Sequence, residues 1–444
     1  HTYLLLFIII MKEYTPKQAI QKVAIIGANR IPFAKANTVY ADASAEDMLS
    51  AALSGLIERY NLANKGIGEV VCGTLLKPNA QFSLTKEALL NTSLPATTPA
   101  YDISQACVTS MQAAFSVANK IALGIIDSAI AGGADSASDI PIGLGNGVRK
   151  ALLRFTKAKN TKERLLALLT INPKELILLP NIKEPRTRLS MGEHQALTTD
   201  IWQITRQAQD EFAFSSHQKL EQAYQAGFFD TLMSSYKGIH KDNVLRTDTS
   251  LEKLNALPVV FGKTQPNPTM TAGNSSVLTD GASVMLLASD DWAKNNQYKP
   301  MAYLTHQITQ AIDFMGKDGE TEGLLMAPIY AVSALLKKTQ LSLQDFDFYE
   351  IHEAFASQVL CTLSAWQSDD FCRQKLGLNQ ALGSIHLDKL NVSGGSLATG
   401  HPFSATGTRL IANAAKLLEQ KGSGRALVVC CAASGQAAAC ILER

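Results

Sequence analysis

The chain has 444 residues, of which 46% are hydrophobic and 18% charged, and its formal net charge is +2. This length and composition predict two or three globular domains with large cores, and the small charge argues against non-specific nucleic-acid binding. Seven cysteines without a Cys-x-x-Cys pair argue against a metal site, and their odd number favours reduced thiols in the cytoplasm.

The N-terminus begins with an apolar run, residues 1–10, which is too short to span a bilayer. It lacks the basic start and the cleavage site of a secretory signal, and Met11 is a more natural first residue. We therefore expect residues 1–19 to be an extension outside the fold, without a targeting signal.

Strand-like and helix-like patterns alternate after this extension. A buried strand is predicted at 23–27, a helix at 45–59, a strand at 69–72, a helix opening at Cys107 and running to residue 123, and a strand at 128–133. A cysteine before an apolar helix is usually a core residue, but a helix N-terminus also lowers a thiol pKa, so Cys107 is also a candidate nucleophile.

The middle of the chain, 139–256, breaks this alternation. Residues 149–164 form a basic amphipathic stretch that includes Arg154, Lys157 and Lys159. A solvated helix face explains it, and so does a contact with a partner subunit, a membrane surface or phosphates.

Near the C-terminus the alternating pattern returns, with a helix after His401, a strand at 425–431 and a closing strand at 437–442. Gly-His-Pro at 400–402 places His401 at the entrance of that helix, where glycine allows close approach and the helix favours negative charge. Alone, this motif also suits an ordinary turn histidine.

Four motifs occur together: Gln-Ala-Cys-Val-Thr-Ser at 105–110, His-Glu-Ala-Phe-Ala at 352–356, Gly-His-Pro at 400–402 and Cys-Ala-Ala-Ser-Gly-Gln at 431–436. Their order and separations resemble the thiolase family, from about Val23 to the C-terminus. Thr-Ala-Gly-Asn-Ser-Ser at 271–276 adds to the match. His352 in place of asparagine and the long segment 366–390 resemble the beta subunit of the fatty-acid-oxidation trifunctional enzyme.

This resemblance implies an α/β thiolase fold of two similar five-layered αβαβα halves with an inserted loop domain. The implied N-terminal half covers 20–138 and is completed by 257–298. The loop domain, which covers the coenzyme A (CoA) site, spans 139–256, and the C-terminal half spans 299–444.

The resemblance also implies catalytic roles. Cys107 is the nucleophile that carries the acyl group, His401 is its base, and His352 holds a water or donates to an enolate oxygen. A strand-end histidine bonded to backbone is the structural alternative for His352. Cys431 matches the family's second acid/base cysteine, and its neighbour Cys430 should point to the other face of the strand.

Backbone N–H groups of Cys107 and Ala433 would form an oxyanion hole in this family. Four positions depart from the family pattern, and a positive φ at any of them would cause strain: Ser110, Ser404, Ser434 and Ala437. Implied CoA and acyl contacts are Ser276, Arg246, Met191 and Phe355. The sequence lacks a dinucleotide or ATP fingerprint, so CoA and acyl-CoA are expected as substrates, with no permanently bound cofactor and no metal.

The implied activity is that of a 3-ketoacyl-CoA thiolase (acetyl-CoA C-acyltransferase) of fatty acid β-oxidation. A biosynthetic acetoacetyl-CoA thiolase and a catalytically weak scaffold subunit remain alternatives. The expected partners are CoA thioesters and a second copy of the chain. The trifunctional resemblance extends these to a heterotetramer with a hydratase/dehydrogenase alpha subunit and to peripheral membrane contact.

Overall fold

A computed structural model describes residues 20–444 except 80, 174–175, 181–182 and 315–322. The expected N-terminal extension, 1–19, lies outside the described residues. Among the described helices, none is long and apolar enough to cross a membrane.

The N-terminal half alternates strands and helices, as the hydrophobic pattern predicts. In chain order the elements are β1 (Val23–Arg30), β2 (Ala34–Lys35), α2 (Ala45–Arg59), β3 (Glu69–Gly73), α3 (Leu84–Leu90), β4 (Ala100–Ile103), α4 (Thr109–Ala122), β5 (Ser128–Asp135) and, after a long excursion, β8 (Thr279–Ser289) and α10 (Asp290–Asn295). Helix α2 starts with a capping box between Ser44 and Asp47. Helices α4 and α15 have no side-chain cap from their N-cap residues.

The C-terminal half repeats this order. Its elements are β9 (Ala302–Ala311), α11 (Ala327–Thr339), β10 (Phe348–Ile351), α12 (Ala356–Gln367), α13 (Asp369–Leu376), α14 (Ser396–Thr399), α15 (Thr406–Lys421), β11 (Arg425–Ala432) and β12 (Gln436–Glu443). An isolated parallel bridge between Tyr349 and Leu390 takes the place that β4 has beside β3. The predicted duplication therefore extends to the pairing of the strands.

The two half-sheets are joined edge to edge. The strand order is β10-β11-β12-β9-β1-β8-β5-β3-β4, and β1 pairs with β9 only at Ala24–Tyr303 and Ile25–Ala302. The outer strands of each half run parallel, β10 with β11 in one and β5, β3 and β4 in the other. Strands β12 and β8, nearer the joint, are antiparallel to both of their neighbours.

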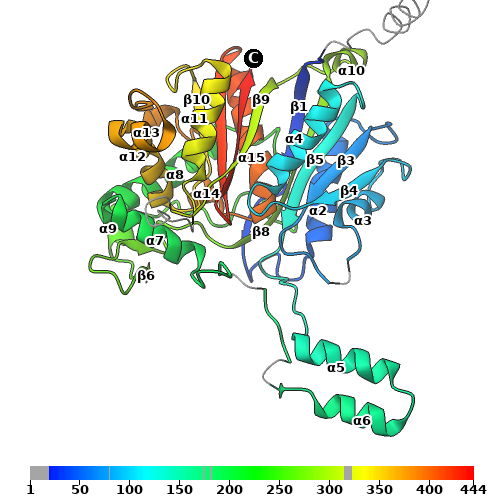
Figure 1. Cartoon of the computed structure of the whole chain (residues 1–444). Helices are drawn as coiled ribbons and strands as arrows, with labels where there is room; N and C mark the ends of the chain where they lie inside the picture. Colours follow the sequence, from blue (N-terminus) through cyan, green and yellow to red (C-terminus); the bar gives the residue numbers. More distant parts are fainter. Residues whose placement is uncertain (1–19, 80, 174–175, 181–182, 315–322) are drawn as a thin grey trace, which may run out of the picture.

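Three hydrophobic cores hold the helices and half-sheets together in five layers. Figure 1 shows the helices and strands that form these layers. One core packs α2 and α3 on the outer face of the N-terminal half-sheet, and another packs α11 and α12 on the C-terminal one. The third core lies between the half-sheets and contains α4 and α15. The five-layered thiolase fold is confirmed, and the two halves share its middle layer.

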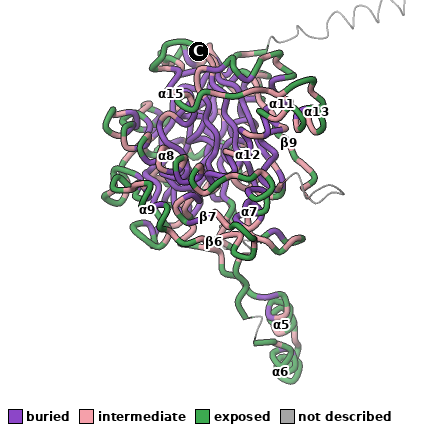
Figure 2. Tube along the Cα trace, turned by 90° about the vertical axis from the view of Figure 1, so that its left-hand side faces the viewer, coloured by how far each residue is buried: buried purple, intermediate pink, exposed green. Residues whose placement is uncertain are grey.

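The excursion between β5 and β8 contains α5 (Asn146–Lys157), α6 (Thr161–Leu169), α7 (Met191–Ile201), α8 (Arg206–Gln225), α9 (Leu251–Asn255), β6 (Val259–Phe261) and β7 (Met270–Thr271). Helices α7 and α8 pack on α12 and α14 of the C-terminal half. Helices α5 and α6 form a hairpin that projects from the body and is mostly exposed (Figure 2). The loop-domain boundaries at 139 and 256 stay a prediction.

Candidate active site

The turn between β4 and α4 presents Cys107. Ala106 has φ +46°, and Thr109 closes the turn because its Oγ1 donates to the Ala106 carbonyl (2.7 Å) and accepts the Gln105 N–H (2.8 Å). Helix α4 therefore begins two residues after the cysteine. Of the seven cysteines, all in the described part of the chain, Cys107 alone is not fully buried.

The Cys107 thiol is held in its protonated form by its surroundings. Burial raises its pKa to about 12, although the backbone N–H groups of Ala433 and of Cys107 itself act in the opposite direction. The expectation that the helix N-terminus lowers this pKa was wrong, because desolvation of the sulfur is the larger effect. The two N–H groups are nevertheless the pair expected to form an oxyanion hole.

Two histidines lie together: His352 follows β10 directly, and His401 comes two residues after α14. The ring centroids of His352 and His401 are 4.2 Å apart. His352 Nδ1 bonds the Ser396 hydroxyl (2.9 Å), and His401 Nδ1 bonds the Thr406 hydroxyl (2.7 Å). Both Nε2 atoms are buried and have no partner among the described residues. The structural alternative, in which the His352 ring bonds to backbone, is therefore wrong, because the ring bonds to the Ser396 side chain.

Both imidazoles are neutral at physiological pH. Burial lowers the pKa of His401 to about 3, and the nearby Arg409 adds to the effect. Burial, His401 and Arg409 together hold the pKa of His352 well below its usual value. Each ring can therefore donate or accept one proton at Nε2 without carrying a resting charge.

The adjacent cysteines at the end of β11 point to different cores. Cys430 belongs to the middle core, and its thiol lies 3.8 Å from the Cys107 carbonyl oxygen. Cys431 packs instead with Phe355, Met270 and Leu325, with Met191 at the edge of the same cluster. Burial and the proximity of Cys107 raise the pKa of the Cys431 thiol. The alternation expected from the strand thus separates the two thiols, and Met191 and Phe355 lie on the Cys431 side.

The turn that follows Cys431 carries Ala433. Gln105 Nε2 donates to Gln436 Oε1 at 2.8 Å, which ties this turn to the Cys107 turn. Ser434 has φ +63°, so one of the four departures from the family pattern sits in left-handed backbone. Ser110, Ser404 and Ala437 do not.

The side chain that Ser110 adds at this position makes a hydrogen bond. Its Oγ accepts the Thr408 N–H (2.9 Å), one of the free donors of the first turn of α15. The serine hydroxyl thus links the two helices whose entrances hold Cys107 and His401.

A cavity of about 360 Å³ lies next to the histidines. Its lining includes Arg246, Lys35, Lys253, Val277 and Leu397. The Val277 carbonyl accepts the His401 N–H (3.2 Å), so one chain segment borders both the cavity and the histidine. Ser276 donates its N–H to the Ala354 carbonyl beside this wall but does not line the cavity.

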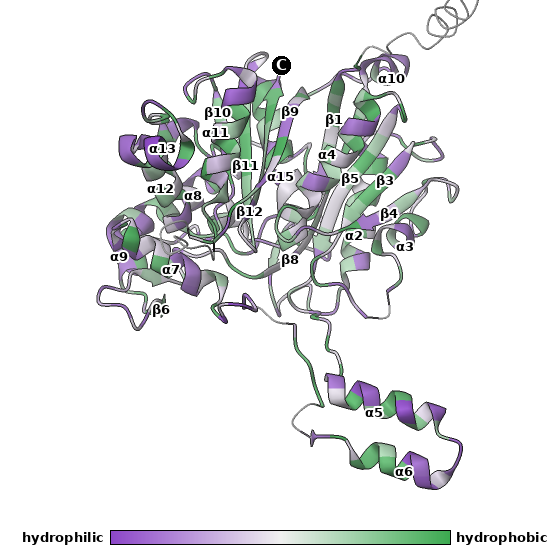
Figure 3. Cartoon of the chain, in the orientation of Figure 1, coloured by the Kyte–Doolittle hydropathy of each residue, from purple (hydrophilic) through white to green (hydrophobic). Residues whose placement is uncertain are grey.

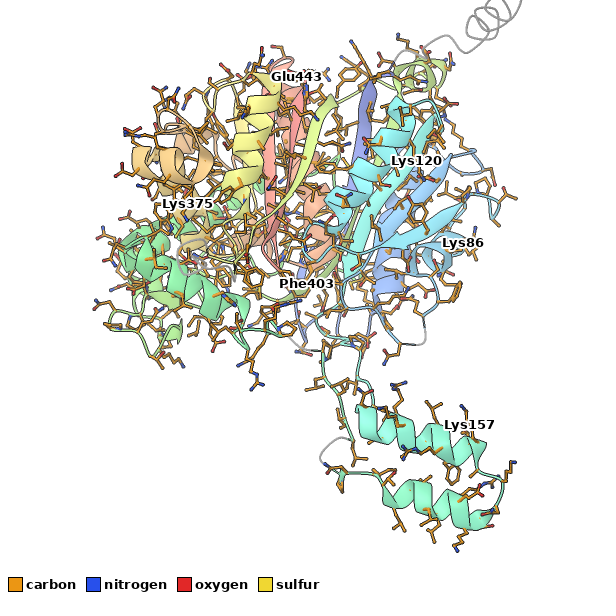
Figure 4. All side chains as sticks on the ribbon, in the orientation of Figure 1. Lys86, Lys120, Lys157, Lys375, Phe403 and Glu443 are labelled. Atoms are coloured by element: carbon orange, nitrogen blue, oxygen red, sulfur yellow. The ribbon has the colours of Figure 1, made fainter. Side chains whose placement is uncertain are left out.

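Sequence reasoning missed the side chains that hold the histidines. Ser396 and Thr406 each lie five residues from His401, and Arg409 donates to Ser396 from the next turn of α15. Hydroxyl residues on both sides of Gly-His-Pro were the available signal. Figure 4 shows Phe403, which packs edge-on against His401, at the end of the body from which the α5–α6 hairpin projects.

The left-handed Ser434 predicts a stabilising substitution. Ser434→Gly should raise the free energy of unfolding by about 0.5–1 kcal/mol, because glycine adopts this φ without a Cβ clash and the exposed hydroxyl contributes little. Urea denaturation measures the change. Ala433→Gly, the matched control at ordinary φ, should lower stability by a similar amount, roughly 0.5–1 kcal/mol. A loss of stability in both variants would contradict the assignment of strain to Ser434.

Comparisons with known proteins agree with this geometry. The family model described as "Thiolase, N-terminal domain" matches residues 23–291, and "Thiolase, C-terminal domain" matches 301–444. A 3-ketoacyl-CoA thiolase of Shewanella baltica is 37% identical over 430 residues, which cover 95% of this chain and 97% of that protein. One from Yersinia enterocolitica is 36% identical over 429 residues, with the same coverage.

Solved structures give the same result. The chain is similar to human mitochondrial 3-ketoacyl-CoA thiolase, with a TM-score of 0.78, 26% identity and coverage of 96% and 99% of the two chains. It is also similar to an acetyl-CoA acetyltransferase of Bacillus anthracis, with a TM-score of 0.77, 26% identity and the same coverage. With both family models matched and relatives aligned over nearly its whole length, the chain belongs to the thiolase family.

Proposed function

We propose that this chain is a 3-ketoacyl-CoA thiolase, an acyltransferase that converts a 3-ketoacyl-CoA and CoA to acetyl-CoA and a shortened acyl-CoA in β-oxidation. One observation carries the proposal. The Cys107 thiol lies under two backbone N–H groups at the entrance of α4, which is bonded to the entrance of α15, and the latter follows His401 and its neighbour His352, two neutral histidines whose Nε2 atoms have no partner among the described residues. The curated relatives bear the name of this activity.

The first half-reaction follows from these groups. The Cys107 sulfur attacks the keto carbon as its proton passes to His401 Nε2, and the N–H groups of Cys107 and Ala433 stabilise the oxyanion. The carbon–carbon bond breaks and leaves the enolate of acetyl-CoA. His352 Nε2 stabilises the enolate oxygen, and the Cys431 thiol protonates the carbon.

The second half-reaction restores the resting state. The thiol of CoA attacks the acyl group on Cys107 and gives its proton to the Cys431 thiolate. The Cys107 sulfur leaves and recovers its proton from His401. All protons are accounted for, and the catalytic groups begin and end neutral.

The cavity lined by Arg246 is the proposed site of CoA, with Arg246 and Lys35 available to its phosphates, whereas Lys253 in the same wall is paired with Asp248 at 2.9 Å. In this proposal Ser276, whose N–H bonds the Ala354 carbonyl, approaches the pantetheine arm, and Met191 and Phe355, which cluster with Cys431, line the acyl pocket. A human mitochondrial 3-ketoacyl-CoA thiolase of 26% identity has been solved in complex with CoA. CoA and acyl-CoA act here as substrates, and a permanent cofactor is not part of the proposal.

Acylation tests the proposal directly. Incubation with acetyl-CoA should add one acetyl group to Cys107, because it is the one cysteine of the seven that is not fully buried and the one with the proposed base and oxyanion hole. Peptide mass spectrometry locates the group. Cys107→Ser should abolish it and Cys430→Ala should retain it. A label on Cys431 would reverse the two assignments.

The low pKa of His401 predicts an unusual pH profile. A group whose folded pKa is about 3 is neutral above that pH, so acidification from pH 8 to about 5 should leave the rate of Cys107 acylation unchanged. Rapid-quench mass spectrometry measures this rate without a CoA thiol among the reactants. His401→Ala should lower it by at least about 10³-fold. An acid limb near pH 6.5 that disappears in His401→Ala would contradict the neutral, buried imidazole.

Two alternatives share the fold. A biosynthetic acetoacetyl-CoA thiolase would use the same residues, and steady-state thiolysis of C4 to C16 substrates separates it by chain length. The strained Ser434 beside Ala433 motivates the second alternative, a weak scaffold subunit. Acylation of Cys107 would exclude it, and absence of acylation would support it. A cytoplasmic location and a homodimer stay predictions.

The α5–α6 hairpin is the proposed contact surface for larger partners. The basic stretch 149–164 lies on α5 and the start of α6, where hydrophobic residues lie among hydrophilic ones, as Figure 3 shows. Exposed leucines on this hairpin include Leu152, Leu153, Leu165, Leu166 and Leu169. None of its residues lines the Arg246 cavity, so the CoA-phosphate alternative loses support. We infer that the hairpin contacts a hydratase/dehydrogenase subunit or an anionic membrane surface.

Charge reversal tests this inference. Replacing Arg154, Lys157 and Lys159 with Glu should weaken binding to the partner subunit or to anionic vesicles by at least about tenfold, because each basic group near an anionic surface contributes about 1 kcal/mol. The kcat for acetoacetyl-CoA should not change, because screening confines the effect to about 8–10 Å.

The matched control replaces Lys294, Lys337 and Lys338, which are exposed on the body. It should leave binding intact. Unchanged binding in the hairpin variant would make the stretch a solvated face, and loss of turnover would make it part of the CoA site.

A further inference from the structure

Ser396 bridges a buried cation and a candidate catalytic histidine. Arg409 Nη2 donates to Ser396 Oγ at 2.9 Å, and the same oxygen lies 2.9 Å from His352 Nδ1. All three residues are buried, with at most 1% of their surfaces exposed. Burying a guanidinium costs several kcal/mol unless it makes compensating interactions, and here the buried carboxyl groups of Glu350 and Glu353 and the Ser396 hydroxyl supply them.

The chemistry of the three groups fixes the direction of the protons. A guanidinium only donates, so Ser396 Oγ must accept from Arg409. The serine hydroxyl then has one acceptor among the described residues, His352 Nδ1. If Nδ1 carried the proton instead, a buried hydroxyl hydrogen would have no partner, which is unfavourable. The His352 proton therefore sits on Nε2, which is buried, unpartnered and directed away from Ser396.

His401 is held differently. Its Nδ1 bonds the Thr406 hydroxyl, and no cation bonds Thr406 in the described part of the chain. Either partner can donate in that bond, so His401 can take a proton at Nε2 and return it. The two rings, 4.2 Å apart, thus differ: the position of the proton is fixed on His352 and can change on His401.

We propose that Arg409, acting through Ser396, is a positioning residue that fixes His352 as a permanent proton donor at Nε2, while His401 remains free to act as the base. This deepens the proposed thiolase function and rests on it. The fixed donor serves the enolate oxygen, whereas acyl transfer to Cys107 uses the backbone N–H groups of Cys107 and Ala433. Enolate formation and acyl transfer should therefore respond differently to loss of the Ser396 bridge.

Ser396→Ala removes the bridge and leaves the cation in place. Deuterium exchange at the methyl group of acetyl-CoA in D₂O, which requires the enolate, should slow by about 10–100-fold, the usual effect of losing a group that orients a catalytic side chain. Acylation of Cys107 by acetyl-CoA should change by less than about threefold. Equal loss in both reactions, or no loss in either, would overturn the proposal.

Two further variants sharpen the test. Arg409→Lys keeps one donor and the charge, so it should retain more exchange activity than Ser396→Ala. Thr408→Val is the matched control, since it removes a buried hydroxyl of the same helix that bonds the Ser283 carbonyl and not a histidine. It should leave the ratio of exchange to acylation unchanged.

A readout without turnover separates this proposal from the proposed function. The full-length chain labelled with ¹⁵N-histidine should show His352 protonated at Nε2, with its signal identified by its loss in His352→Asn, and Ser396→Ala should produce a mixture of tautomers. A proton on Nδ1 in the unmodified chain would refute the positioning role. If the unmodified chain neither acylates nor exchanges, the thiolase proposal fails while the tautomer measurement still decides this one.

Discussion

The contact between the first turns of α4 and α15 is the constraint on which the site depends. A Cβ on Gly407 would lie 2.5 Å from the Met111 nitrogen, so only glycine lets the two helices approach this closely. Ser110 joins the same turns through the Thr408 N–H. Because Cys107 precedes one helix and His401 the other, this packing places the two helix entrances, one from each half of the duplicated fold, side by side, as the proposed site requires.

Burial is the second organising property of this centre. It keeps the thiols protonated and the imidazoles neutral, so the proposed chemistry moves protons between neutral groups instead of starting from a thiolate. A dry, preorganised site strengthens each hydrogen bond to a developing oxyanion. The strained Ser434 and the unpartnered Nε2 atoms are local costs of the same arrangement.

The sequence predicted the alternating elements and the duplication, because the hydrophobic period is a local signal, and its glycine-rich motifs pointed to the residues that we propose carry the chemistry. Cys431 was separated from Cys430 by the family resemblance together with strand alternation. The pKa of Cys107 was mispredicted, since desolvation depends on tertiary packing that one helix terminus does not reveal. Ser396 and Arg409 were missed for a similar reason: their link to His352 joins residues 44 and 57 positions apart.

The central claim is that one site, assembled from both halves, cleaves 3-ketoacyl-CoA by acyl transfer to Cys107. Steady-state thiolysis with both products quantified tests it most directly. The account predicts CoA-dependent loss of 3-ketoacyl-CoA, with one acetyl-CoA and one shortened acyl-CoA formed for each substrate consumed, and no turnover in Cys107→Ser. Turnover that persists in Cys107→Ser, or none in the unmodified chain, would contradict it.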